Sequence, residues 1–162
     1  EIVFGDWSSD VCSSDLNEWY TLKNFFATPA IDYLWNKEKS GLKEYNDLGI
    51  DDRETVKELI RYIREFDKIN NRFAGVLHLN TNHLPYRSPD EYHLWSGNKV
   101  DVYDNSILYQ DDLIRKIFNE LKEQQILSNT IVVFTSDHGQ AFKEHNFSGH
   151  LEIGRASCRE RV

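Results

Sequence analysis

Asp137 and His138 lie just beyond a short apolar run, and together they offer ligands for a cation. The run, Ile131–Phe134, is unbroken, which is typical of a strand buried on both faces of a sheet. In open α/β sheets, ligands bind beyond the carboxyl ends of the strands. An Asp beside a His supplies an anionic oxygen and a neutral nitrogen, both of which metal ions accept. Asp and Gly are also ordinary turn residues, so the alternative is a strand that simply ends in a turn.

A second apolar run, Phe73–Leu79, also carries histidine near its end. His78 lies inside the run and His83 lies five residues further on. A histidine within a strand is more often a packed side chain than a ligand, so His78 is the weaker candidate. If the two runs are neighbouring strands, the residues beyond their ends meet over one edge of the sheet. The converging residues are His83, Asp137, His138 and His150.

The elements that must position these residues alternate along the chain. They are a helix from Asp51 or Asp52 to Ile69, a strand at Phe73–Leu79, a helix at Val102–Gln125 and a strand at Ile131–Phe134. This order predicts an α/β fold with a largely parallel sheet flanked by helices, in which the second helix joins the two strands. The first third of the chain predicts only two short helices, at Glu18–Phe26 and Ala30–Lys37.

Both ends of the chain resemble translated sequencing adapters. DWSSDVCSSDL, at residues 6–16, is one reading frame of a sequencing-library adapter, and EIGRASCRERV, at residues 152–162, resembles its partner. We therefore predict that residues 1–16 and 152–162 are not biological, make few buried contacts and add nothing to the core. The alternative is that they are genuine polar tails.

Removing the two ends changes the composition. Both cysteines, Cys12 and Cys158, lie in them, so residues 17–151 predict no disulfide, thiolate metal site or cysteine nucleophile. The ends hold six of the 27 acidic and three of the 19 basic residues, so the net charge changes from −8 to −5. That balance argues against nucleic acid as a partner. No apolar run in the sequence approaches the length needed to span a membrane.

The segment from Phe73 to His150 resembles the sulfatase-like branch of the alkaline phosphatase superfamily. The resemblance rests on LHLNTNHLPY at Leu77–Tyr86, on the helix and strand that end in TSDHG at Tyr103–Gly139, and on EHNFSGH at Glu144–His150. It implies that residues 17–151 are part of a catalytic domain, a fragment of an alkaline-phosphatase-like sandwich. One position departs from the pattern, because Lys143 stands where many members have Gly.

The resemblance implies roles for the candidate residues. Asp137 and His138 would bind the catalytic divalent metal, whose identity among calcium, zinc and manganese stays open. His83 and His150 would face the sulfate or phosphate group, or a second metal, and act in catalysis, with His78 near that group. A divalent cation offsets the negative charge of such an ester, and neighbouring imidazoles hydrogen-bond its oxygens or protonate the leaving group.

Three functions remain open at this stage. The spacing of the histidines most resembles a sulfatase that hydrolyses a small-molecule or glycan sulfate ester. The close alternative is a membrane-anchored phosphoethanolamine or phosphoglycerol transferase acting on a lipid head group. A non-catalytic sensing domain of the same fold is the third, which the intact Asp137–His138 pair argues against.

The resemblance also implies a nucleophile upstream of this segment. In sulfatases it is a formylglycine made from Cys or Ser in a Cys/Ser-x-Pro-x-Arg motif, and in the transferases it is Thr or Ser. Since residues 17–151 contain neither motif, we expect the fragment by itself to be inactive. The parent is expected outside the cytoplasm, periplasmic or anchored in the membrane and facing outward, with any membrane association supplied by segments beyond this one.

Overall fold

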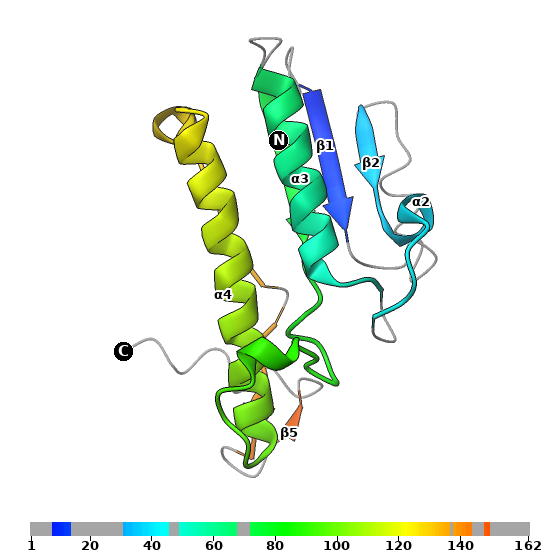
Figure 1. Cartoon of the computed structure of the whole chain (residues 1–162), viewed down its shortest axis with the longest axis vertical. Coiled ribbons are helices and arrows are strands. Elements are labelled where there is room, and N and C mark those ends of the chain that lie inside the picture. Colours follow the sequence, from blue (N-terminus) through cyan, green and yellow to red (C-terminus); the bar gives the residue numbers. More distant parts are fainter. Residues whose placement is uncertain are drawn as a thin grey trace.

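The computed structural model describes residues 8–13, 31–45, 49–67, 72–136, 138–143 and 148–149. Its main sheet contains three strands in the order β2 (Tyr33–Trp35), β1 (Ser8–Ser13) and β3 (Phe73–His78). Both pairings are parallel, and β1 pairs along its whole length with β3. Figure 1 shows β1 beside β2. The predicted α/β class with a largely parallel sheet is confirmed.

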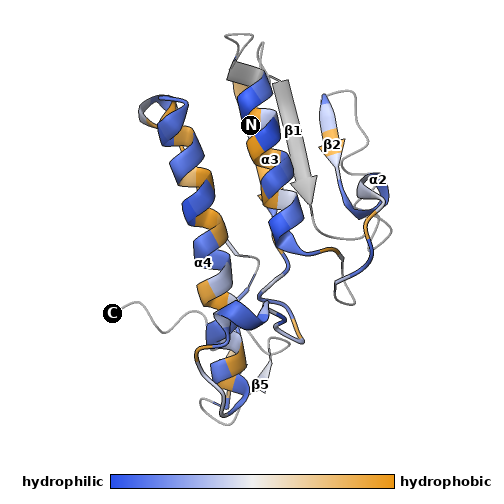
Figure 2. Cartoon of the chain, viewed as in Figure 1, coloured by the Kyte–Doolittle hydropathy of each residue, from blue (hydrophilic) through white to orange (hydrophobic). Residues whose placement is uncertain are grey.

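The helix α3 (Asp52–Asp67) begins because Asp51 caps it. The Asp51 side chain accepts a hydrogen bond of 2.9 Å from the backbone N–H of Arg53, which satisfies one of the donors left open at a helix start. The apolar residues of α3 recur along one side of the helix. Figure 2 shows them in orange, alternating along the ribbon with hydrophilic residues in blue. The buried residues among them are Val56, Leu59 and Ile63.

The helix α4 (Lys99–Glu123) confirms the predicted long helix but begins three residues earlier than expected. Asn98 and Asp101 form a capping box, each side chain bonding the other's backbone N–H. The apolar periodicity does not reveal this first turn, because Lys99, Val100 and Asp101 all lie outside the buried stripe. Within the described residues, no helix is both long and apolar enough to cross a membrane.

The core lies where α3 and α4 pack together against the sheet. One cluster joins Leu59 and Ile63 to Leu121, and the other joins Val56 to Tyr109 and Leu113.

The interface between α3 and α4 also holds an ion pair. Both oxygens of the buried Glu120 carboxylate accept from the Arg64 guanidinium, at 2.8 and 2.6 Å, and this pairing keeps the pKa of Glu120 below its usual value.

The predicted strand at Ile131–Phe134 is wrong. The segment forms no strand, and its residues expose 92%, 38%, 78% and 60% of their surfaces in chain order. The Phe134 ring stacks on Phe118 of α4, with centroids 6.0 Å apart. An apolar run becomes a buried strand only where it pairs with the edge of a sheet, and among the described residues this run pairs with neither edge strand of the main sheet, β2 or β3.

Two segments of the first third differ from what the sequence led us to expect. Ser8–Ser13, inside an end segment that we expected to add nothing to the core, is the central strand of the main sheet. The adapter origin of residues 1–16 and 152–162 stays a prediction. Ala30–Lys37 is not a helix, because it contains β2, and α2 (Lys37–Ser40) starts only at its last residue. The predicted helix Glu18–Phe26 and residues 152–162 lie outside the described residues.

Candidate functional site

His83 lies in a tightly turned loop that follows β3. The backbone N–H of His83 donates to the Asn80 carbonyl at 3.0 Å, and the N–H of Tyr86 donates to the His83 carbonyl at 2.7 Å. The His83 Nδ1 lies 2.9 Å from the Leu84 carbonyl oxygen. Since a carbonyl only accepts, Nδ1 carries the proton, and the lone pair of the neutral ring is on Nε2.

Tyr86 closes this loop in an uncommon conformation. Its φ of 59° lies in the left-handed region, which few residues other than Gly adopt, and its side chain is almost fully buried. Such strain persists only where the surrounding structure enforces it, and it is concentrated at functional sites. The loop that presents His83 therefore has a fixed shape.

A hydrogen bond to the backbone sets the tautomer of the His138 ring. Its Nδ1 lies 2.9 Å from the Gly139 carbonyl oxygen, so Nδ1 carries the proton and Nε2 holds the lone pair. Histidines that bind metals usually donate their other ring N–H to a carbonyl or carboxylate in this way. His138 thus fits the divalent cation that the sequence implies.

Three aromatic rings bring the candidate segments together. Tyr86, from the His83 loop, packs edge-on against Tyr103 of α4 at 5.1 Å between centroids. Phe142 lies 5.0 Å from Tyr103 and 6.0 Å from Tyr86. Phe142 belongs to β4 (Ala141–Phe142), four residues after His138 in the sequence. The loops that carry His83 and His138 therefore share one packing centre.

A short hairpin adds the third segment to this centre. The strand β4 pairs antiparallel with β5 (Ser148–Gly149), placing Ala141 opposite Gly149 and Phe142 opposite Ser148. His150 is the next residue in the sequence. All three motifs that carry the family resemblance thus have described residues at, or paired with, the aromatic centre.

Three of the predicted site residues, His78, His83 and His138, lie among the residues that the structure describes. Asp137 and His150 lie outside the described residues, so their ligand and catalytic roles stay predictions. His78 is exposed at the end of β3, where its backbone pairs with Ser13. Within the described residues, no three His, Cys, Asp or Glu side chains gather closely enough to hold a metal ion.

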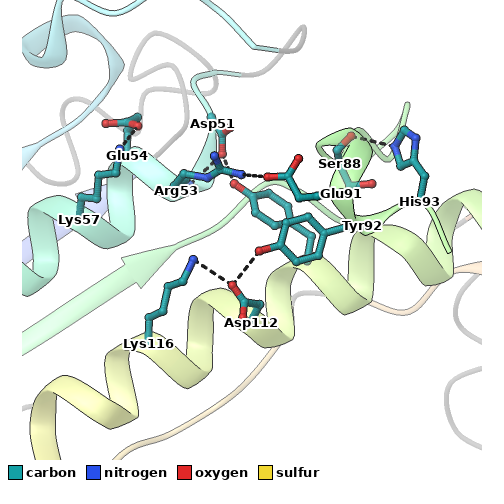
Figure 3. A network of polar contacts seen from close by, with 11 residues as sticks. Asp51, Arg53, Glu54, Lys57, Ser88, Glu91, Tyr92, His93, Asp112 and Lys116 are labelled. Atoms are coloured by element: carbon teal, nitrogen blue, oxygen red, sulfur yellow. Dashed lines mark hydrogen bonds and ion pairs between the residues drawn. The ribbon is translucent and has the colours of Figure 1, made fainter.

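A polar network beside the His83 loop was not anticipated from the sequence. Figure 3 shows it joining the start of α3, the short helix η2 (Asp90–Tyr92) and α4. Arg53 donates to Glu91 at 2.9 Å, and the buried Tyr109 hydroxyl donates to Asp51. Burial, and then the Asp51 contact, raise the pKa of Tyr109, so its hydroxyl stays a donor.

The other end of the network is centred on Asp112. Tyr92 donates to its carboxylate at 2.7 Å, and Lys116 lies 2.9 Å away (Figure 3). Burial alone would raise the pKa of Asp112, but the hydrogen bonds from Lys116, Tyr92 and Arg115 outweigh it and lower the pKa to about 2. The network fixes η2 against both helices, and its residues are too far apart in sequence for spacing to reveal it.

The departure from the family pattern at Lys143 has a structural consequence. Lys143 has a φ of 87°, a conformation that suits Gly and strains other residues. We expect Lys143→Gly to raise the free energy of unfolding by up to about 1 kcal/mol, measured by urea denaturation. Lys122→Gly, in the regular helix α4, is the matched control and should lower it by about 1 kcal/mol. A loss of stability in both variants would contradict the proposed strain.

Solved structures share this fold. The chain resembles a lipoteichoic acid synthase, LtaP, from Listeria monocytogenes, with a TM-score of 0.66 and 16% identity over 75% of this chain and 31% of that one. It also resembles a protein in the alkaline phosphatase superfamily from Vibrio parahaemolyticus, with a TM-score of 0.61 and 15% identity over 73% of this chain and 29% of that one. The predicted alkaline-phosphatase-like fold is confirmed.

The chain spans about a quarter or less of the length of the curated relatives that it matches. A lipoteichoic acid synthase from Staphylococcus saprophyticus is 25% identical over 86% of this chain and 22% of its own length. A Kdo(2)-lipid A phosphoethanolamine 7''-transferase from Salmonella typhimurium is 24% identical over 82% and 25%. Phosphoethanolamine transferase EptA from Escherichia coli K12 is 39% identical, but over only 32% of this chain and 9% of its own length.

The family model described as Sulfatase matches residues 3–159, nearly the whole chain. The match runs through the His83 loop, the Asp137–His138 pair and the β4–β5 hairpin. The chain therefore belongs to the sulfatase family.

Proposed function

We propose that the chain is part of the catalytic domain of a metal-dependent transferase that moves a phosphate-ester head group, such as phosphoglycerol or phosphoethanolamine. The observation that carries the proposal is the packing of Tyr86, Tyr103 and Phe142, which brings the His83 loop, α4 and the β4–β5 hairpin together. The relatives named for synthesis of lipoteichoic acid and for phosphoethanolamine transfer favour this reaction over sulfate hydrolysis.

The described residues suit recognition of a phosphate ester. The Nε2 atom of His83 accepts a hydrogen bond when the ring is neutral, and donates to an ester oxygen when the ring is protonated. His138 with Asp137 would hold the divalent cation, which when bound offsets the negative charge of the ester. The chain has a net charge of −8, so an anionic substrate needs such a local positive centre.

The same groups would serve a sulfate ester, which also presents anionic oxygens around a tetrahedral centre. The family name keeps a sulfuric ester hydrolase as the second candidate. The two reactions differ in the nucleophile, formylglycine in one and Thr or Ser in the other, and in the substrate. A lipid donor would place the parent at the outer face of a membrane, whereas a soluble sulfate ester would not require one.

A substrate comparison on the full-length parent tests this proposal. We expect release of diacylglycerol from phosphatidylglycerol or phosphatidylethanolamine in detergent micelles, which stops when EDTA removes the metal and resumes with added Mn²⁺ or Zn²⁺. Aryl sulfate should give no product under the same conditions. Turnover of aryl sulfate without turnover of either lipid would reject the transferase and favour the sulfatase.

A further inference from the structure

The buried carboxylate of Asp52 lies against the loop that presents His83. We propose that Asp52 is a positioning residue, which holds this loop in the shape that the site requires. The inference deepens the proposed function and rests on it, because it assigns His83 to the ester. It concerns a residue that reaches the site only through the loop.

Three donors of the loop converge on Asp52. Its side chain accepts from the backbone N–H of Asn80 at 2.9 Å, from the backbone N–H of Thr81 at 2.7 Å and from the Thr81 hydroxyl at 2.6 Å. Asp52 is only 2% exposed, and Asn80 and Thr81 are similarly buried. A carboxylate removed from water in this way persists only where hydrogen bonds compensate for its lost hydration.

The capping of α3 does not account for Asp52. That task falls to Asp51, whose side chain accepts from the backbone N–H of Arg53. The two adjacent carboxylates therefore have separate roles, one within the helix start and one across 28 or 29 residues of sequence. A long-range contact of a buried charge with backbone N–H groups fixes the path of the chain rather than the end of a helix.

The second helix holds the loop from its other side. Ser106 of α4 donates to the Asn82 side-chain oxygen at 3.0 Å, and the Asn82 amide donates to Gln110. Asn80 and Thr81 are thus fixed to α3, and Asn82 is fixed to α4. His83 comes immediately after these three anchored residues, so both helices hold the backbone that leads into it.

Loss of the Asp52 contacts would leave buried N–H groups without acceptors. The loop relieves that cost by moving toward water, and His83 moves with it. A displacement of about 1 Å at a catalytic group reduces the rate by up to about 100-fold, even when the group itself is intact. The effect should fall on kcat more than on KM, since the substrate keeps its other contacts.

The test compares Asp52→Asn with Glu120→Gln in the full-length parent. Each change replaces a buried carboxylate with a neutral amide. Asp52 contacts the loop, whereas Glu120 contacts Arg64 and Gln124, away from the loop. We expect Asp52→Asn to lower kcat by about 10- to 100-fold at unchanged metal content. Glu120→Gln should stay within about 2-fold of the parent at a temperature where both variants are folded.

The nuclear magnetic resonance signals of the His83 ring give a readout that does not depend on turnover. They should shift in Asp52→Asn and stay in place in Glu120→Gln. If the parent turns over neither ester, the proposed function fails, yet these signals still report whether Asp52 positions His83. Unshifted His83 signals together with an unchanged kcat in Asp52→Asn would overturn the inference.

A second pair of variants covers the case in which Asp52→Asn does not fold. Thr81→Val removes the 2.6 Å hydroxyl contact and keeps the backbone N–H, whereas Thr81→Ser retains both donors. Thr81→Val should shift the His83 signals and lower kcat, and Thr81→Ser should restore both. Equal behaviour of the two Thr81 variants would reject the role of the anchor.

Discussion

Metal-dependent turnover of the full-length parent should disappear in His138→Ala, with a fall in kcat of about 1,000-fold or more. The Nδ1 proton of His138 is donated to the Gly139 carbonyl, which places the lone pair of the neutral ring on Nε2, the atom that we propose binds the metal. Alanine offers no replacement donor, so the cation that offsets the ester charge is lost with it. The measurement is kcat together with metal content by mass spectrometry, and both should fall. Asp137→Ala is expected to do the same.

His93→Ala is the matched control for this prediction. The His93 Nε2 lies 2.9 Å from the Ser88 carbonyl oxygen, at the edge of the polar network in Figure 3. The substitution removes an imidazole of the same kind, but from the segment after η2 rather than from a motif segment. We expect metal content and kcat to stay within about 2-fold of the parent. Full activity in His138→Ala would reject the ligand assignment.

The elements that the sequence predicts well are those whose local pattern and packing agree. The helices α3 and α4 and the strand β3 combine a clear apolar period with partners elsewhere in the chain. Ile131–Phe134 has the pattern but no partner, so it remains exposed. The strand β1 shows the opposite case, because it has partners but no clear sequence pattern. Its sequence, SSDVCS, has little strand propensity, yet its backbone occupies the position between β2 and β3.

The residues of the candidate site also differ in how well the sequence predicts them. Side chains that do chemistry are recognisable by type and spacing, so the sequence alone indicates His83 and His138 as candidates. The residues that hold them are not recognisable in this way, because a buried carboxylate contacting a distant loop leaves no short-range pattern. Asp52 therefore suggests only a helix cap from sequence, and its contacts with Asn80 and Thr81 emerge from the fold.

Deleting residues 1–16 should destabilise this chain more than any single substitution. The strand β1 pairs with three residues of β2 and with six of β3, so the deletion removes the whole parallel ladder of the main sheet. The lost hydrogen bonds contribute about 1 kcal/mol each, which together approach the full stability of a domain of this size. Thermal unfolding followed by near-ultraviolet circular dichroism should lose its cooperative transition. The helical far-ultraviolet signal should largely remain, because α3 and α4 pack through Leu59, Ile63 and Leu121.

Two substitutions at Asp10 test the contribution of β1 to stability without shortening the chain. Asp10 lies in the middle of β1, opposite Tyr33 on one side and Gly75 on the other. Asp10→Pro removes a backbone donor that a central strand requires, and should lower the unfolding temperature sharply. Asp10→Val keeps that donor and raises strand propensity, so it should raise the unfolding temperature slightly. If β1 derives from an adapter, backbone hydrogen bonds alone would hold it in the sheet. The two variants test this, because only Asp10→Pro removes a backbone donor. Equal unfolding temperatures for the two variants would show that the chain folds without β1.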